Sequence, residues 1–191
     1  MITTTKKEGK IYLQTPYNAE FVKRIKAAGG RWTMDCWVVS DRAEEIVEKI
    51  MMEIFGENGK TAVETVNVRV TVKPGYCLTG YQSGASLFGR PVAKAWGRDS
   101  GAKVCDGVCF EKGAPTSGGS VKNWKTLIDE GTVFLMYDVP RAIVEREIGT
   151  PSLEDVEVEI IKTGISREAL EAEKSQLLAR LAEIENELSR G

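Results

Sequence analysis

The first forty residues contain apolar residues at two kinds of spacing, one typical of strands and one typical of helices. Ile11 and Leu13 are separated by a polar residue, as in a half-buried strand. Asn18 is a favourable N-cap for a helix that Gly29 would end, and residues 31–40 resemble two short strands around a turn. The pattern predicts a strand, a helix and a hairpin within forty residues.

A second helix is predicted to begin at Asp41 and to stop at Gly56. The apolar residues of the two helices fall on one face of each: Phe21, Val22 and Ile25, then Ile46, Val47, Ile50, Met51 and Ile54. Two helices over a short sheet can bury one modest core, so residues 1–59 are interpreted as a small N-terminal domain.

The middle of the chain has strand patterns separated by glycine-rich sequence. Residues 65–72 alternate strictly between valine and polar residues, and 132–137 and 156–160 are further strand candidates. A short helix is predicted to start at Asp138 with Pro140 and to run through Ile148, and 74–120 is rich in glycine and small polar residues. These features predict a β-rich second domain over residues 60–163 with long glycine-rich loops.

Residues 164–191 form an uninterrupted run of helix-forming residues after an N-cap at Ser166. A stripe of apolar residues follows a heptad spacing: Leu170, Leu177, Leu181, Ile184 and Leu188. The stripe favours a coiled coil that makes a homodimer, and the alternative is a helix docked on its own chain. The whole chain is therefore expected to be α+β, ending in a long helix.

Charge is distributed unevenly, although the net charge is only −2. Residues 73–125 have eight basic and three acidic residues, a net charge of +5, whereas residues 138–191 have seven basic and thirteen acidic residues, a net charge of −6. An anionic partner would meet the middle of the chain, unless the basic residues only form an ordinary solvated surface. No apolar run is long enough to span a bilayer and no apolar signal core begins the chain, so a cytoplasmic protein without a membrane partner is expected.

Catalytic chemistry has few candidates in this composition. The chain has no histidine, which excludes Ser-His and Cys-His nucleophiles and histidine metal sites. Cys36, Cys77, Cys105 and Cys109 are interpreted as free thiols, although the last two invite a zinc interpretation. Asp99, Asp106 and Glu111 could form a nuclease cluster, but the usual Glu-x-Lys arrangement is missing. We therefore expect a protein that is not an enzyme and that needs no metal or cofactor.

Four short motifs near the N-terminus match a known kind of module. They are Pro16-Tyr17-Asn18, Lys23-Arg24-Ile25-Lys26, Gly30-Arg31-Trp32, and Trp37 before Val38-Val39. Together they resemble the small HARP-like module of annealing helicases, which also occurs in phage-encoded proteins. The resemblance implies binding of nucleic acid with structured or branched character, by a protein of phage or mobile-element character. No ATPase motor or Walker-type loop accompanies the motifs, so remodelling activity is not implied.

Basic and aromatic side chains are the candidates for contacts with nucleic acid. Those of the N-terminal domain are Lys23, Lys26, Arg31 and Trp32. Those of the glycine-rich stretches are Arg90, Lys94, Trp96, Arg98, Ser117, Ser120, Lys122, Trp124 and Lys125. Glycines let backbone N–H groups approach an anion, lysines add charge, and tryptophan stacks on bases. The alternatives are flexible surface loops in the middle and core packing for Trp32 and Trp37.

The sequence thus predicts a binding protein whose ligand is DNA or RNA. A second hypothesis keeps the same loops but gives them another role. In it, the protein inhibits a host defence system, either by capping a defence protein such as a CRISPR effector or by sequestering a nucleotide signal in a pocket of the middle domain.

Overall fold

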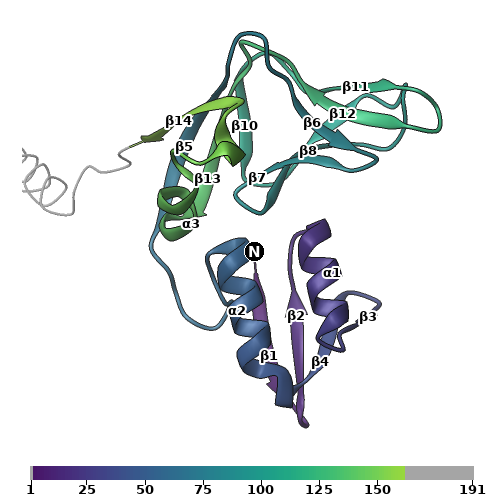
Figure 1. Cartoon of the computed structure of the whole chain (residues 1–191), viewed down its shortest axis with the longest axis vertical. Coiled ribbons are helices and arrows are strands. Elements are labelled where there is room, and N and C mark those ends of the chain that lie inside the picture. Colours follow the sequence, from purple (N-terminus) through teal and green to yellow (C-terminus); the bar gives the residue numbers. More distant parts are fainter. Residues whose placement is uncertain (1, 162–191) are drawn as a thin grey trace, which may run out of the picture. The chain divides into compact units, whose positions relative to one another are not determined.

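The computed structural model describes residues 2–161 (Figure 1). In this part of the chain 44% of the residues lie in strands and 21% in helices, so the fold is β-rich and the expected α+β class is wrong. The three α-helices described have nine, twelve and seven residues. The long C-terminal helix predicted for 164–191, with its leucine stripe, lies outside the described residues, and dimerisation through it stays a prediction.

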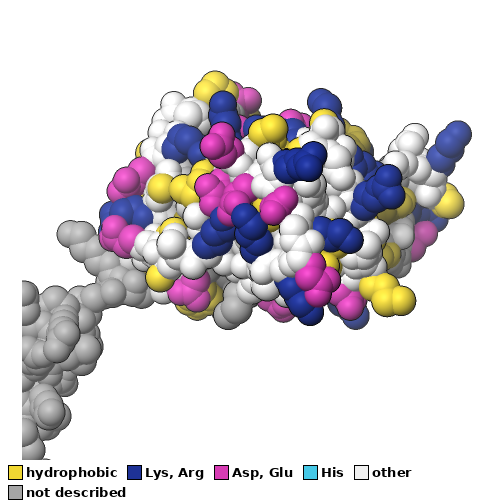
Figure 2. All heavy atoms as spheres, turned by 90° about the horizontal axis from the view of Figure 1, so that it is seen from below, with side chains coloured by type: hydrophobic (Ala, Val, Ile, Leu, Met, Phe, Trp, Pro, Cys, Tyr) yellow, Lys and Arg dark blue, Asp and Glu magenta, His cyan; other side chains and the backbone are white. Residues whose placement is uncertain are grey.

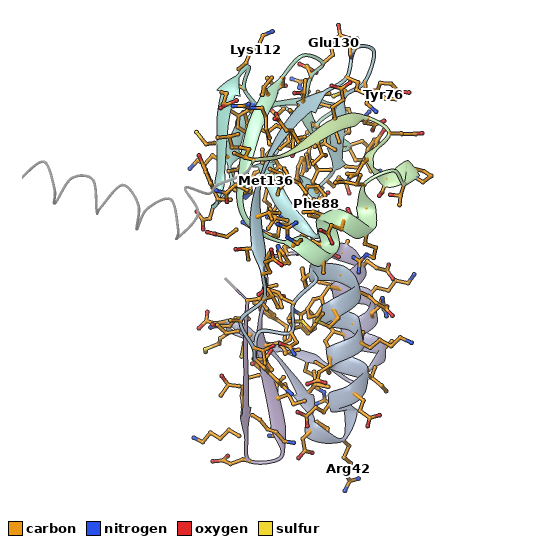
Figure 3. The ribbon with its side chains drawn as sticks, turned by 90° about the vertical axis from the view of Figure 1, so that its left-hand side faces the viewer. Arg42, Tyr76, Phe88, Lys112, Glu130 and Met136 are labelled. Atoms are coloured by element: carbon orange, nitrogen blue, oxygen red, sulfur yellow. The ribbon has the colours of Figure 1, made fainter. Side chains whose placement is uncertain are left out.

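The first sheet is antiparallel and has the strand order β1-β2-β4-β3. Its strands are β1 (Thr3–Lys7), β2 (Lys10–Gln14), β3 (Arg31–Thr33) and β4 (Cys36–Ser40). The helices α1 (Ala19–Ala27) and α2 (Glu44–Phe55) cover one face of this sheet, and side chains of the other face project away from them (Figure 3). The expected arrangement of two helices over a short sheet is confirmed.

Alternation along the strands decides which side chains enter this core. Alternate residues of β2 and β4 face the helices, and the buried set is Ile2, Ile11, Leu13, Phe21, Ile25, Trp37, Val39, Val47, Ile50, Met51 and Phe55. Two details differ from expectation. Ile46 is exposed, and a 3-10 turn (Asp41–Ala43), capped by the hydroxyl of Ser40, precedes α2.

A second antiparallel sheet has the order β10-β13-β5-β14. Its strands are β5 (Thr65–Val72), β10 (Val108–Lys112), β13 (Val133–Pro140) and β14 (Val156–Ile161). The valines of β5 are all buried, as the strict alternation predicted. Helix α3 (Arg141–Glu147) and a 3-10 turn (Pro151–Leu153) lie between β13 and β14.

The glycine-rich stretch that was expected to form long loops instead contributes most of two three-stranded sheets. One has the order β11-β12-β6 and the other β7-β8-β9. The strands are β6 (Leu78–Tyr81), β7 (Gly84–Leu87), β8 (Arg90–Ala95), β9 (Ala102–Val104), β11 (Thr116–Gly119) and β12 (Trp124–Ile128). Each strand has only three to six residues, too few to give a clear period-two pattern.

Small side chains let the strands of these sheets approach one another closely. A Cβ on Gly80 of β6 would meet the carbonyl group of Gly84 on β7. Ala93 and Ala95 of β8 are fully buried. The hydroxyl of Thr126 on β12 accepts the N–H of Ala95 at 2.9 Å and donates to the carbonyl of Ser83 at 2.7 Å. Glycine in this stretch therefore serves close packing rather than loop flexibility.

Replacing Gly80 with alanine tests this account. Because the new methyl group would meet backbone, we expect Gly80→Ala to lower the free energy of unfolding by about 1–3 kcal/mol. Gly97→Ala is the matched control, since a Cβ there meets no atom within 4 Å and its backbone is not left-handed. Urea denaturation measures both variants. Equal effects of the two substitutions would contradict the packing role of Gly80.

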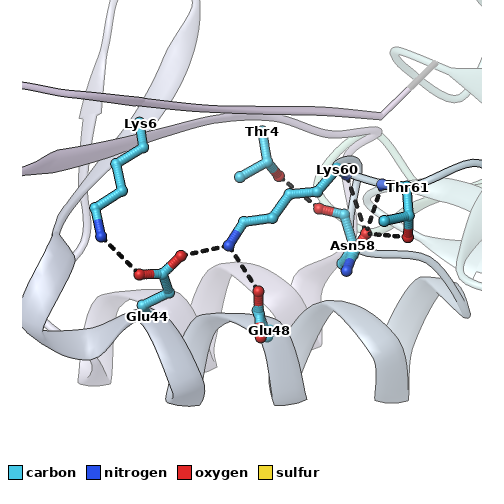
Figure 4. A network of polar contacts seen from close by, with 7 residues as sticks. All are labelled: Thr4, Lys6, Glu44, Glu48, Asn58, Lys60 and Thr61. Atoms are coloured by element: carbon cyan, nitrogen blue, oxygen red, sulfur yellow. Dashed lines mark hydrogen bonds and ion pairs between the residues drawn. The ribbon is translucent and has the colours of Figure 1, made fainter.

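A network of charged side chains fastens the segment after α2 to the helix (Figure 4). The ammonium group of Lys60 pairs with Glu44 and, at 2.6 Å, with Glu48. Lys6 of β1 lies 2.8 Å from the other oxygen of Glu44. The side chain of Asn58 accepts the N–H groups of Lys60 and Thr61. These contacts join β1, α2 and residues 58–61.

Acid should weaken this network through Glu44. Hydrogen bonds from Lys6 and Lys60 lower the pKa of Glu44 from 4.5 to about 2. A carboxyl whose pKa is lowered by folding stabilises the fold above its ordinary pKa, and that stability is lost as the pH falls through the folded value. We therefore expect Glu44→Gln to have a lower Tm than wild type at about pH 7. The difference in Tm between the two proteins should disappear as the pH falls from about 4.5 to about 2.

Glu45→Gln provides the control for this experiment. Glu45 also lies in the first turn of α2, and it forms no ion pair within residues 2–161. Both glutamates experience the helix dipole, so the difference between the variants isolates the lysine contacts. If the difference in Tm between Glu44→Gln and wild type is the same at about pH 2 as at about pH 7, the network does not stabilise the fold.

Candidate nucleic-acid interface

Strand β8 and the residue that follows it present two of the predicted binding residues, Lys94 and Trp96, on one side of the sheet. Ala93 and Ala95 are buried against the neighbouring sheet, so alternation turns Lys94 and Trp96 to the opposite side. Lys103 of β9 is the cross-strand partner of Lys94 and lies on the same side of the sheet. The sequence therefore places two lysines and an indole ring on one outward face.

A turn held by Ser100 fixes the position of Trp96. The hydroxyl of Ser100 accepts the backbone N–H groups of Trp96 at 3.0 Å and of Gly97 at 3.1 Å. Ser117 of β11 donates its hydroxyl to the carbonyl of Arg98 at 2.8 Å. These bonds stabilise the loop that follows β8 from both sides.

Asn18, which precedes α1, positions a fourth side chain, that of Tyr17. The side-chain oxygen of Asn18 accepts the N–H of Phe21 at 2.9 Å and caps α1, while its amide nitrogen donates to the carbonyl of Gly89 at 3.3 Å. Gly89 belongs to the turn between β7 and β8 and has a φ of +73°. The preceding residue, Tyr17, is thereby held beside β8.

Four side chains meet at this point, and we call them the lysine–aromatic cluster: Tyr17, Lys94, Trp96 and Lys103. The ammonium nitrogen of Lys94 lies 5.8 Å from the ring centroids of both Tyr17 and Trp96. The nitrogen of Lys103 also lies 5.8 Å from the Trp96 ring. Tyr17 is 58% exposed and Trp96 is 55% exposed. Two rings and two cations are thus accessible to a ligand.

The charge of the cluster is not neutralised by carboxylates. Within residues 2–161, no acidic side chain lies within ion-pair distance of Lys94 or Lys103. Cation–π contacts hold the lysines near the rings but leave their positive charge unpaired. The arrangement can bind an anionic group at the lysines and a flat unsaturated ring on Trp96 or Tyr17.

A second pair of the same kind lies on another sheet. Lys125 of β12 is the cross-strand partner of Tyr81 on β6, and its nitrogen is 4.5 Å from the tyrosine ring centroid. Trp124, its neighbour, is partly buried. The structure therefore places the predicted Lys125 on a ring, but in a sheet separate from the lysine–aromatic cluster.

The other predicted residues of the middle stretch have local structural contacts. The guanidinium of Arg90 donates to the carbonyls of Tyr137 and Asp138, each at 3.0 Å. Arg98 pairs with Asp99. Ser120 accepts the N–H of Asn123 in the β11–β12 turn, and the carbonyl of Lys122 accepts the side-chain amide of Gln82. The structure does not gather these residues into one pocket.

The predicted residues of the N-terminal region lie on two elements. Lys23 and Lys26 are exposed on α1. Arg31 and Trp32 lie on β3, and the Trp32 ring is 54% exposed while it packs on Trp37 at a centroid distance of 5.4 Å. Trp37 is buried, which confirms the core interpretation for that ring.

Three cluster or pair residues were not among the sequence candidates: Tyr17, Lys103 and Tyr81. Tyr17 belongs to the motif Pro16-Tyr17-Asn18, so its position before an N-cap was visible. The pairings of Lys103 with Lys94 and of Tyr81 with Lys125 depend on strand register, which the short glycine-rich strands do not reveal.

A cleft of about 880 Å³ does not suit the nucleotide pocket that one form of the second hypothesis, sequestration of a nucleotide signal, requires. Its lining includes Asp35, Glu57, Asp106 and Asp138 but only one basic residue, Arg90, and it includes nothing from residues 113–125. Burial raises the pKa of Glu57 above 4.5. Burial, together with the charge of Asp106, also raises the pKa of the nearby Cys105 thiol. An anionic nucleotide would meet excess negative charge here.

Neither a cluster of potential metal ligands nor a membrane-spanning helix is present in the described part of the chain. The four cysteines are free, and residues 2–161 contain no group of three or more acidic or cysteine side chains placed to hold a metal ion. The helices in this range are too short and too polar to cross a bilayer.

On the face that Figure 2 shows, Lys and Arg side chains lie among Asp and Glu side chains. Comparisons with protein families, characterised proteins and solved structures give no match. The geometry of the side chains is therefore the basis for a functional argument.

Proposed function

We propose that this chain is a non-enzymatic nucleic-acid-binding protein that grips its ligand at the lysine–aromatic cluster. The observation that supports the proposal most strongly is the position of the Lys94 ammonium between two half-exposed rings, with Lys103 beside the second ring. Phosphate groups bind to cationic side chains, and unstacked bases stack on aromatic rings. Both kinds of side chain meet on one outward surface.

The surroundings of the cluster support the same ligand class. The backbone around Trp96 and Tyr17 is fixed by Ser100 and Asn18, so little conformational entropy is lost when the rings bind. The four free thiols agree with a reducing compartment, and we place the protein in the cytoplasm. The HARP-like motifs support a phage or mobile-element character.

The test is fluorescence anisotropy with labelled single-stranded DNA, RNA and duplex DNA over about 50 to about 200 mM salt. We expect wild type to bind with an affinity that falls as salt rises. Trp96→Ala should weaken binding by about 1–3 kcal/mol through lost stacking. The double variant Lys94→Ala, Lys103→Ala should reduce the slope of log affinity against log salt by about 0.7 per lost phosphate contact on a single strand.

Two controls make this experiment specific. Trp96→Phe keeps a ring and should retain most of the affinity, and Lys49→Ala removes an exposed lysine of α2 that is far along the chain from the cluster. If wild type fails to bind any of the nucleic acids at about 50 mM salt, the proposed function is wrong.

A second function is favoured by the β3–β4 turn. Met34 has a φ of +43° and is 93% exposed, next to the half-exposed Trp32. A left-handed backbone conformation is uncommon for a bulky residue, and residues held in such conformations cluster at functional sites. This surface supports the alternative of an inhibitor that caps a protein of a host defence system.

Met34→Gly separates the two functions. Glycine accepts the positive φ, so we expect this variant to be as stable as wild type or more stable, and to bind nucleic acid as wild type does. If a protein partner uses this turn, affinity for that partner should fall by more than about 1 kcal/mol in calorimetry with a purified candidate effector. Unchanged affinity for an effector that binds wild type would show that the turn is not the contact.

A further inference from the structure

Within residues 2–161, one face of the N-terminal sheet is covered by no helix. Because Trp37 and Val39 of β4 face the helices, their neighbours in β4 face the other way. The strand register aligns Thr5, Tyr12, Val38 and Arg31 in one row across all four strands. We call this surface the open sheet face, and Figure 3 shows side chains projecting from the side of the sheet opposite the helices.

The charged side chains that the strands contribute to the open sheet face are all basic. Lys7 and Lys10 face each other at the hairpin end of β1 and β2, and Arg31 lies on the edge strand β3. No strand residue on this face is acidic; the remaining members are Thr3, Thr5, Tyr12, Gln14, Thr33, Cys36, Val38 and Ser40. One carboxylate, that of Glu8 in the turn, lies 3.7 Å from Lys7.

The centre of the face is an aromatic platform. Tyr12 and Val38 are cross-strand partners and both are partly buried, so the ring lies in the middle of the sheet with the cations around it. At about 4.8 Å between strands, the row from Thr5 to Arg31 spans about 14 Å. This length suits two or three nucleotides rather than a large protein surface.

The cleft carboxylates limit the face at its other end. Gln14 and Asp35 both line the acidic cleft, whereas Lys7 and Lys10 lie at the far end of their strands. An anionic chain is therefore favoured across the middle and hairpin-end rows and disfavoured towards the cleft.

We propose that the open sheet face binds single-stranded nucleic acid, with a base on Tyr12 and phosphates at Lys10, Arg31 and Lys7. The proposal rests on the proposed function and extends it to a second contact surface. Tyr17 of the lysine–aromatic cluster is only three positions after Gln14 on this face, so the two residues are at most about 11 Å apart. One strand of nucleic acid can therefore contact both surfaces.

A single strand fits this face better than a duplex does. A flat sheet with one central ring offers stacking to exposed bases, and bases are exposed in single strands but not in a duplex. A protein partner would need a larger apolar area than Tyr12 and Val38 provide. Charge and chemistry therefore point to one occupant.

The experiment measures affinity against oligonucleotide length. Labelled oligo-dT from about 4 to about 30 nucleotides is titrated with wild type and with the triple variant Tyr12→Leu, Lys10→Gln, Arg31→Gln. We expect the affinity of wild type to rise with length until both surfaces are occupied. The triple variant should reach its plateau at a shorter length, with affinity for the longest oligonucleotide reduced about five-fold or more.

Controls separate this inference from the proposed function. Tyr12→Phe keeps the ring and should behave as wild type, and Lys49→Gln removes an exposed cation elsewhere. If Tyr12→Leu does not fold, the double variant Lys10→Gln, Arg31→Gln leaves the platform intact and should still lower the plateau affinity. A wild-type length profile in this double variant and in a folded triple variant overturns the inference alone. A wild type that binds neither oligo-dT nor the RNA and duplex DNA of the earlier test overturns both proposals.

Discussion

The close approach of β6, β7 and β8 to β12 is the constraint on which the rest of the structure depends. Gly80 leaves no room for a side chain against Gly84, and Ala93 and Ala95 fill the space on the inner side of β8. Thr126 is buried in the same place and satisfies two backbone groups. Since unpaired buried polar groups are costly, this one hydroxyl fixes the relation of the strands. Small inner residues then oblige Lys94 and Trp96 to face solvent.

Asn18 links these packed strands to helix α1. One side chain caps α1 and also bonds to the turn before β8, so the position of Tyr17 follows from the positions of both elements. Arg146 of α3 adds a second link, donating to the carbonyls of Met52 and Glu53 at the end of α2. Residues up to Ile161 consequently form one compact unit. The cluster is built by these backbone contacts rather than by pairing with carboxylates.

The sequence predicted the elements whose periodicity is long enough to read. The helices α1 and α2, strand β5 and the burial of Trp37 follow from apolar spacing, and each is confirmed. Strands of three to six residues in 74–120 gave no readable period, and their glycines suggested loops. The β-rich class was missed for that reason. Lys94 and Trp96 were named from composition, but their assembly with Tyr17 and Lys103 depends on register and on a contact over more than seventy residues.

Electrostatics gives the two proposed surfaces a common direction. The lysine–aromatic cluster and the open sheet face are joined by the segment from Gln14 to Tyr17, and part of that segment also lines the carboxylate-rich cleft. Phosphates that pass this segment would be repelled by Asp35 and Asp106, while uncharged bases would not. A bound strand should therefore turn its backbone away from the cleft as it passes from Tyr12 towards Trp96. In this proposal the acidic cleft is a boundary that would orient the ligand, which a uniformly basic surface could not do.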